Sequence, residues 1–154
     1  MNAADKANSV EIVSKIAAVV NLFKSQFPEA SVDLSPWIKN AETAKFDDPD
    51  SIDLAFHFPR YGFTSPSQMI LMQIRLPERA QVDPHRACCG ADRFASGVEI
   101  SGHNYVGQQW QFTTTGRKFW GISLPLPDAE AKLKHICQQI LQLFDLVREG
   151  AMES

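Results

Sequence analysis

The sequence lacks the features that would direct a protein into a membrane or onto nucleic acid. None of its apolar runs reaches the roughly 18 residues that span a bilayer. The N-terminal segment lacks the unbroken apolar stretch of a signal peptide. Lys and Arg number only 15 against 18 Asp and Glu, which gives a formal net charge of -3. Because phosphate groups are bound by basic surfaces, we expect neither nucleic acid nor a membrane as a partner, and we expect a cytoplasmic protein.

Cysteine is scarce, and its placement argues against a disulfide framework. The chain has three cysteines, of which Cys88 and Cys89 are adjacent and Cys137 is distant. Adjacent cysteines rarely bridge each other because the bond would strain the peptide between them. An odd count leaves one thiol unpaired in any case. Reduced thiols in a reducing compartment are the simpler interpretation.

Sequence motifs of the common enzyme classes are missing as well. The chain has no phosphate-binding loop, no Gly-x-Gly-x-x-Gly, no Gly-x-Ser-x-Gly and no His-Glu-x-x-His. We therefore expect no cofactor. A binding protein is favoured over an enzyme, although these absences do not exclude an enzyme.

Two amphipathic helices are predicted at the ends of a single domain that covers residues 1–154. The first runs from about Ser9 to Phe27, with Asn8 as its cap and with Val13, Ala17 and Val19 widening its apolar stripe. The second begins near Pro127 and is expected to stop at Gly150. Its apolar stripe comprises Leu133, Ile136, Cys137, Ile140, Phe144 and Val147.

The segment between the helices has the pattern of an antiparallel sheet. Alternating apolar residues predict strands at 51–58 and 69–76, after a possible short strand at 31–34. Three further strands are predicted at 98–101, 105–113 and 118–124, with a turn at 102–104 and with Val106 and Trp110 on one face. The predicted fold class is α+β, a two-layer sandwich in which about five or six antiparallel strands pack against both helices.

One candidate site is a small group of metal-ligating residues. If residues 85–89 form a helical turn, His85, Cys88 and Cys89 share one face, and thiolates with an imidazole are typical zinc ligands. A structural zinc site needs a fourth ligand, and His103 would have to come from a distant turn. The alternative is a pair of small cysteines that pack as hydrophobic residues.

A second candidate is a ligand pocket between the sheet and the C-terminal helix. Aromatic walls with a few polar groups are typical of small-molecule pockets. The alternative, which we favour, is that the tryptophans fill the core. The residues that could line such a pocket are His57, Tyr61, His103, Tyr105, Trp110 and Trp120.

The functional hypothesis depends on one predicted strand that is apolar on both faces. Met69 and Leu71 lie opposite the core-facing residues of that strand, and they would be exposed if both helices covered one face of the sheet. This arrangement favours a non-enzymatic binding or regulatory protein that acts through protein–protein contact, as a homodimer. The alternative is a small-molecule or metal-binding protein, or an enzyme, that uses one of the two candidate sites.

Overall fold

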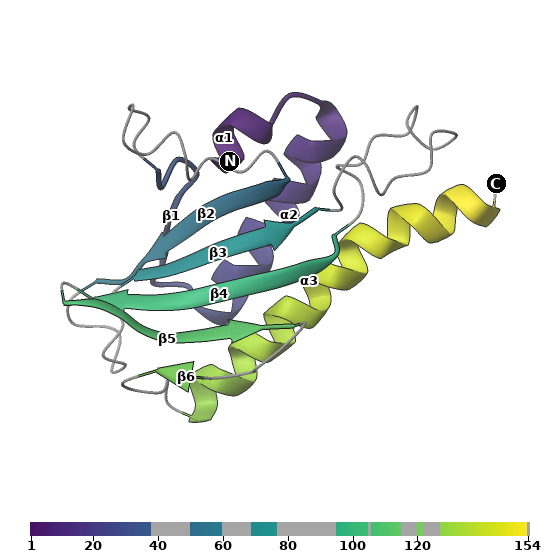
Figure 1. Ribbon diagram of the computed structural model, residues 1–154. Helices are drawn as coiled ribbons and strands as arrows, with labels where there is room; N and C mark the ends of the chain where they lie inside the picture. Colours follow the sequence, from purple (N-terminus) through teal and green to yellow (C-terminus); the bar gives the residue numbers. More distant parts are fainter. Residues whose placement is uncertain are drawn as a thin grey trace.

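The computed structural model describes residues 1–37, 50–59, 69–76, 95–104, 106–114, 120–121 and 127–153. The helices within these residues are α1 (Ala3–Lys6), α2 (Val10–Gln26) and α3 (Pro127–Glu153), as Figure 1 shows. The strands are β1 (Ser31–Asp33), β2 (Ser51–His57), β3 (Met69–Arg75), β4 (Gly97–Asn104), β5 (Gly107–Thr113) and β6 (Trp120–Gly121).

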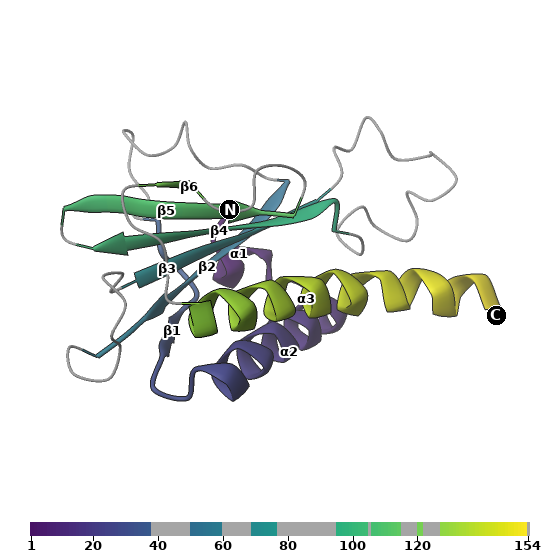
Figure 2. The same cartoon turned by 90° about the horizontal axis from the view of Figure 1, so that it is seen from below.

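The strands form one antiparallel sheet in the order β1 to β6, so each strand lies beside its neighbour in the sequence. Figure 2 shows α2 and α3 side by side against the same side of this sheet. The predicted α+β class, with one antiparallel sheet and one layer of terminal helices, is therefore confirmed.

The apolar side chains of the strands meet the helices in one core. Ile52 lies opposite Ile74, which in turn lies opposite Val98, and each is at most 1% exposed. The ring of Phe23 in α2 stacks on Phe56 in β2, with their centroids 3.7 Å apart. The largest fully buried side chains are Trp110, Phe23, Phe56, Phe144, Ile52, Leu54, Ile70, Met72, Ile74, Ile100, Leu133 and Ile136.

Helix α2 begins close to its predicted start but with a different cap. The hydroxyl of Ser9 accepts a hydrogen bond from the Ile12 N–H at 3.3 Å, so Ser9 is the N-cap and the prediction of Asn8 is wrong. Both residue types cap well, and their chemistry alone does not choose between neighbours. The prediction is confirmed for Val19, which is buried, but is wrong for Val13 and Ala17, because both are exposed. The sheet contacts a narrower stripe of α2 than the sequence suggested.

Contacts at both ends show that α2 and α3 run antiparallel. Lys15 in α2 donates through Nζ to the Leu143 carbonyl at 3.2 Å and lies over the ring of Phe144. At the other end, the ammonium of Lys132 lies 5.5 Å from the ring centroid of Phe27, which directly follows α2. The aliphatic stem of a lysine can cover apolar surface in this way while its charge finds a partner.

The apolar stripe of α3 is confirmed over the part whose side chains are described. Its buried members there are Leu133, Ile136, Cys137, Ile140 and Phe144. Val147 lies beyond this part. The expected stop at Gly150 is wrong, because α3 continues to Glu153. A glycine weakens a helix but does not by itself end one.

The turn between β4 and β5 lies further along the chain than predicted. Asn104 Oδ1 accepts hydrogen bonds from the N–H groups of Val106 and Gly107 at 2.8 and 3.2 Å. An asparagine side chain bonded in this way holds a turn just after itself. Val106 is consequently at the turn and 71% exposed, and does not share the face of Trp110. Strand β4 therefore includes all of the residues predicted to turn, Gly102, His103 and Asn104.

Candidate functional site: the open face of the sheet

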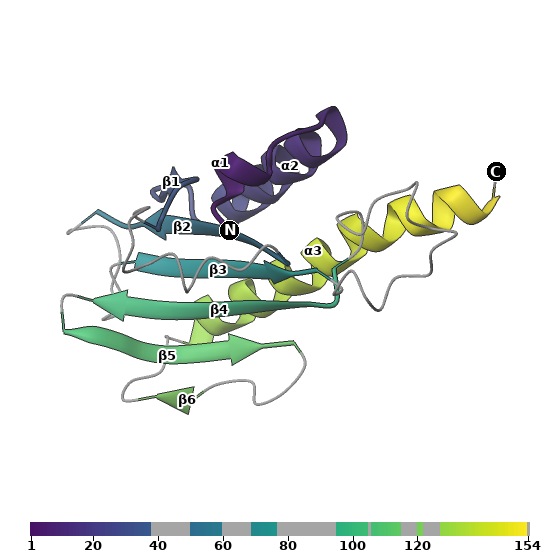
Figure 3. The ribbon, with the colours of Figure 1, turned by 45° about the horizontal axis from the view of Figure 1, so that its top comes forward.

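We call the side of the sheet that faces away from α2 and α3 the open face. Figure 3 looks onto this side, with α3 behind the strands. Side chains alternate along a strand, so the neighbours of the core residues belong to the open face. Its described residues in β1 to β5 are Ser31, Asp33, Ser51, Asp53, Ala55, His57, Met69, Leu71, Gln73, Arg75, Gly97, Glu99, Ser101, His103, Gln108, Gln111 and Thr113.

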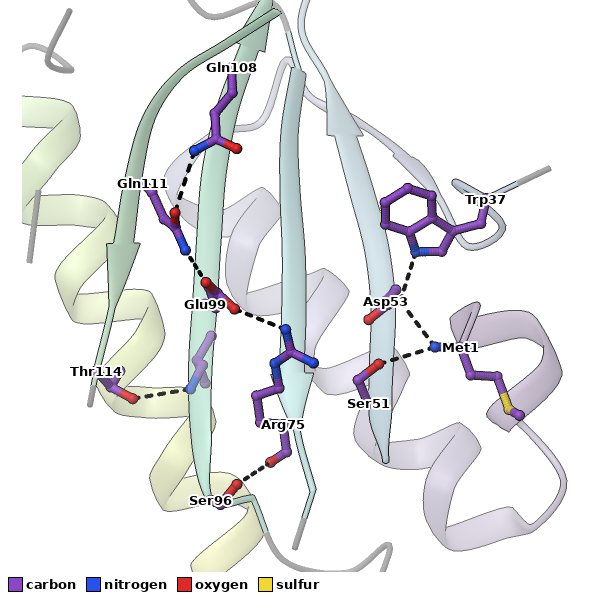
Figure 4. A network of polar contacts seen from close by, with 11 residues as sticks. Met1, Trp37, Ser51, Asp53, Arg75, Ser96, Glu99, Gln108, Gln111 and Thr114 are labelled. Atoms are coloured by element: carbon purple, nitrogen blue, oxygen red, sulfur yellow. Dashed lines mark hydrogen bonds and ion pairs between the residues drawn. The ribbon is translucent and has the colours of Figure 1, made fainter. Parts of the chain in front are cut away.

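A chain of hydrogen bonds crosses the open face from β3 to β5 (Figure 4). Arg75 Nη2 donates to Glu99 Oε2 at 3.1 Å, and Gln111 Nε2 donates to Glu99 Oε1. Gln108 Nε2 donates in turn to Gln111 Oε1 at 3.4 Å. Arg75 and Glu99 are 39% and 25% exposed, so solvent screens their attraction and the pair adds little to stability. The pair places the long side chains of Arg75 and Glu99 beside each other across β3 and β4.

A β-bulge in β5 makes this chain of contacts possible. Residues three apart on a regular strand point to opposite faces. Gln108 pairs with His103, but the register then shifts so that Trp110 pairs with the residue before His103. Gln109 is the extra residue of a bulge, which re-aims the side chains around it. Gln108 and Gln111 therefore lie on the same face.

A second polar cluster lies at the β2 edge of the open face and surrounds a buried carboxylate (Figure 4). Asp53 is fully buried, and its Oδ2 accepts hydrogen bonds from the Met1 ammonium at 3.0 Å and from Trp37 Nε1 at 2.7 Å. Ser51 Oγ accepts a further bond from the same ammonium at 3.1 Å. Within the described part of the chain, Asp53 Oδ1 is buried without a hydrogen-bond partner.

Backbone contacts hold the first residues of the chain beside this carboxylate. The Asp53 N–H donates to the Met1 carbonyl at 2.8 Å, and Asn2 forms a parallel bridge with Asp53. The Asn2 side chain exchanges two hydrogen bonds with the backbone of Trp37, at 2.9 and 3.0 Å. The cluster is therefore positioned by three segments that are distant in the sequence.

Two of the predicted ligand residues, His57 and His103, also lie on the open face. They are the cross-strand neighbours of Met69 on its two sides. His57 Nε2 is 3.7 Å from Asp33 Oδ2, and His103 Nε2 is 2.8 Å from Ser101 Oγ. Burial lowers the pKa of His103 below its usual 6.5. His103 is therefore neutral at pH 7 and exchanges a hydrogen bond with the serine hydroxyl.

The structure separates these histidines from the predicted aromatic wall. Trp110 is completely buried on the core side, as expected of a tryptophan that fills the core. Strand β6 places Trp120 opposite Gln111, but the side chain of Trp120 lies outside the described part. Tyr61 and Tyr105 also lie outside the described residues. Ligand binding by this set stays a prediction.

The predicted metal ligands His85, Cys88 and Cys89 all fall outside the described residues. Among the residues that are described, no group of three or more His, Cys, Asp or Glu side chains could hold a metal ion. Cys137 is a free thiol buried in the core, where burial raises its pKa to about 12. A thiol in that state is protonated and unreactive at neutral pH.

The expected apolar patch on the open face is weaker than the sequence suggested. Leu71 is only 8% exposed and Met69 is half-buried. The large exposed apolar residues in the described ranges lie elsewhere and are Val10, Val13, Leu34 and Val106. Recognition through the open face would consequently depend on its polar side chains as much as on Met69.

Sequence reasoning missed the polar residues that dominate this face. Arg75, Glu99 and Gln111 each alternate with apolar core residues, which is the ordinary pattern of a half-buried strand. The alternation indicated their face, but not that they would meet. That depends on the pairing register and the bulge, and neither is visible in one sequence.

The comparisons with known proteins identify a family without a described activity. No curated protein and no solved structure matches the chain. Among the helices that the structure describes, none is long and apolar enough to cross a membrane. One family model matches residues 4–146, which include α2, all six strands and the part of α3 up to residue 146. The chain belongs to this family, which is described as a domain of unknown function.

Proposed function

We propose that this chain is a non-enzymatic binding protein that contacts a protein partner through the open face. The observation that carries the proposal is the chain of hydrogen bonds from Arg75 through Glu99 and Gln111 to Gln108. Long polar side chains on a merely solvated surface are usually free to move, and fixing them costs conformational entropy. Here their mutual hydrogen bonds favour one arrangement before any partner arrives, which lowers the cost of forming hydrogen bonds to one.

The mixture of side chains on this face also suits a protein partner. The central strand places half-buried Met69 beside polar His57 and His103. Protein interfaces typically combine such apolar contact with about one hydrogen bond per 100–200 Å². The two helices are already engaged with the core side of the sheet (Figure 2). A second copy of this chain is the first partner to test, since self-association needs no other component.

The test uses a photo-reactive benzoylphenylalanine placed at Gln108, the exposed end of the hydrogen-bond chain, which leaves the Arg75–Glu99 and Glu99–Gln111 contacts in place. The matched control carries the same group at Asn21, which is exposed on the outer side of α2. Irradiation of the purified protein at Gln108 should give an adduct of twice the chain mass if the partner is a second copy. Irradiation in native extract should give one discrete larger adduct if the partner is another protein.

The Asn21 position should give neither adduct. Equal labelling at both positions would show non-specific contact and would contradict the proposal. A complete lack of adducts at Gln108, both alone and in extract, would also contradict it. Light scattering on the unmodified protein checks the mass of any self-adduct independently.

A further inference from the structure

Ser101 and His103 form a hydrogen-bonded pair on the open face. Both lie on β4, an inner strand of the sheet (Figure 3). They are two residues apart, so their side chains share one face of the strand. Ser101 Oγ is 2.8 Å from His103 Nε2. A hydroxyl at this distance from an imidazole nitrogen has the arrangement of a nucleophile and its general base.

His103 is in the protonation state that a general base requires. Partial burial lowers the pKa of His103 below its usual 6.5, so its ring is neutral at pH 7. The tautomer that carries the ring proton on Nδ1 leaves the Nε2 lone pair for the serine hydroxyl. Ser101 then donates its O–H to Nε2, which prepares Oγ to attack an electrophilic carbon. A serine without such a base is a weak nucleophile at neutral pH.

A side-chain amide lies beside the serine on one side. Gln111 in β5 is the residue directly opposite Ser101, and the side chains of opposite residues are neighbours. The Gln111 amide donates through Nε2 to Glu99 and accepts through Oε1 from Gln108. These contacts use one of its two N–H groups. The other N–H remains for an oxyanion that forms on a carbon bound to Ser101 Oγ, a role that suits glutamine side chains.

Apolar side chains flank the pair on its other side. Leu71 lies opposite Ser101 and Met69 lies opposite His103, both in β3. Such a surface suits the hydrocarbon part of an acyl group, because its removal from water is favourable. Ser101 and Leu71 are each 8% exposed. A short acyl group therefore fits this site better than a bulky one.

We propose that Ser101 is a nucleophile that accepts a short acyl group from an activated ester or thioester, with His103 as its base. With a thioester, the bond between Oγ and the carbonyl carbon forms while the carbon–sulfur bond breaks. The hydroxyl proton moves to His103 Nε2 and then to the departing thiolate, so the products are an acyl-serine and a thiol. This inference goes beyond partner binding and does not depend on it, because the acyl-serine is a modification of the chain itself.

The probe for the reaction is p-nitrophenyl acetate, a small activated ester with a coloured leaving group. The full chain should release p-nitrophenolate in a burst, and its intact mass should increase by one acetyl group. Fragmentation of peptides should place that group on Ser101. Ser101→Ala should abolish this adduct. Acetylation of amino groups with none on Ser101 would overturn the inference.

His103→Gln tests the base, since glutamine can still form a hydrogen bond to Ser101 but does not take up its proton. Acylation of Ser101 should then slow by about a hundredfold or more. The matched control is His57→Gln on the same face, since the ring of His57 lies 3.7 Å from Asp33. The rate should not change in the control. No slowing in His103→Gln, or equal slowing in both variants, would overturn the inference.

A second serine serves as an internal control within the same chain. Ser31 lies directly opposite His57, but its hydroxyl donates to the His57 carbonyl at 3.5 Å and not to an imidazole nitrogen. Ser31 is also more exposed than Ser101. If a general base decides the reaction, Ser31 should remain unlabelled while Ser101 is acylated. Labelling of Ser31 at the same rate as Ser101 would overturn the inference.

The native chain also gives a test that needs no variant. Acylation of the serine should accelerate as His103 loses its proton and level off above about pH 7, because its pKa lies below 6.5. Among the described residues, Met69 and Gln108 lie opposite His103 and do not titrate, Glu99 lies two positions beyond the serine, and His57 lies beyond Met69. In urea the rate should rise with hydroxide over the whole range. The same pH profile in the folded and unfolded chains would overturn the inference.

The photo-adduct at Gln108 separates this inference from the proposed function. If Ser101 is acylated but no adduct forms, the nucleophile stands and the protein-binding function is wrong. If the adduct forms but Ser101 is never acylated, protein binding stands and this inference is wrong. Continued release of p-nitrophenolate through repeated acylation of Ser101 would support the nucleophile and would contradict a non-enzymatic function.

Discussion

Asp53 is the residue at which packing and electrostatics are most tightly coupled. Its carboxylate is fully buried, and its Oδ2 accepts hydrogen bonds from a charged ammonium and an indole N–H. Hydrogen bonds to ionised groups are about twice as strong as those between neutral groups. Its Oδ1 has no partner in the described residues, which adds a desolvation cost. The site is stable only while the ammonium of Met1 and the indole of Trp37 remain in place.

Asp53→Asn should therefore destabilise the fold although it hardly changes the shape of the side chain. The amide cannot neutralise the Met1 ammonium, so the free energy of unfolding should fall by roughly 2–4 kcal/mol. Urea unfolding monitored by tryptophan fluorescence measures the loss. The matched control is Asp128→Asn, whose carboxylate is 85% exposed in a pair with Lys132. The control should change stability by less than about 0.5 kcal/mol, and equal losses in the two variants would contradict this account.

Single residues of the open face also show which contacts could be predicted from the sequence and which could not. The face on which Arg75 and Glu99 lie follows from simple alternation and could be predicted. Their contact could not, because it requires Arg75 to lie two residues from the position opposite Glu99, and only the register decides that. The burial of Asp53 could not be predicted either. The Met1 ammonium and the Trp37 indole that bury it come from distant segments.

At the scale of elements, the packing of β6 against the bulge depends on one glycine. Gly121 has a φ of +145°, and a Cβ at this position would lie 1.9 Å from the Gln109 carbonyl oxygen. No side chain fits that space unless the backbone of β6 or of the bulge moves. Gly107 has a similar φ of +139°, but a Cβ there would meet no atom within 4 Å. A comparison of alanine variants at the two glycines therefore distinguishes the cost of backbone strain, which both share, from the cost of steric contact, which only Gly121 has.

Gly121→Ala should lower the free energy of unfolding by roughly 2–4 kcal/mol, through strain and the clash together. Gly107→Ala should cost only the conformational strain, about 1–2 kcal/mol. Chemical denaturation of both variants measures the difference. Equal losses would show that the close approach of β6 to the Gln109 carbonyl does not matter in solution.

The elements themselves were predictable where hydrophobic periodicity is long and regular. The stripe of α3 and the alternation in β2 and β3 each extend over enough residues to define their type. Element ends were less predictable, because they depend on one or two local contacts. The Ser9 cap and the bonds to Asn104 Oδ1 each moved a boundary by one or more residues.

At the scale of the whole molecule, the helical layer is held by burial against the sheet. Cys137 reports on that contact, because it lies in the buried stripe of α3 and is 0% exposed. Burial raises its pKa from 9.0 to about 12. Between these two pH values the unfolded thiol ionises while the folded thiol stays protonated. Stability from this group is therefore fully present below pH 9 and is lost as the pH rises toward 12.

Cys137 should react with a thiol reagent only when α3 separates from the sheet. The measurement uses Cys88→Ser and Cys89→Ser together, so that Cys137 is the one remaining thiol of the three. For a domain of ordinary stability, labelling at pH 8 should be at least about a thousandfold slower in native buffer than in urea. Adding Ser14→Cys, at an exposed position of α2, should give one rapidly labelled thiol in native buffer. Labelling of Cys137 in native buffer at a rate faster than global unfolding would mean that α3 separates from the sheet on its own, and the two-layer core would then not be a single cooperative unit.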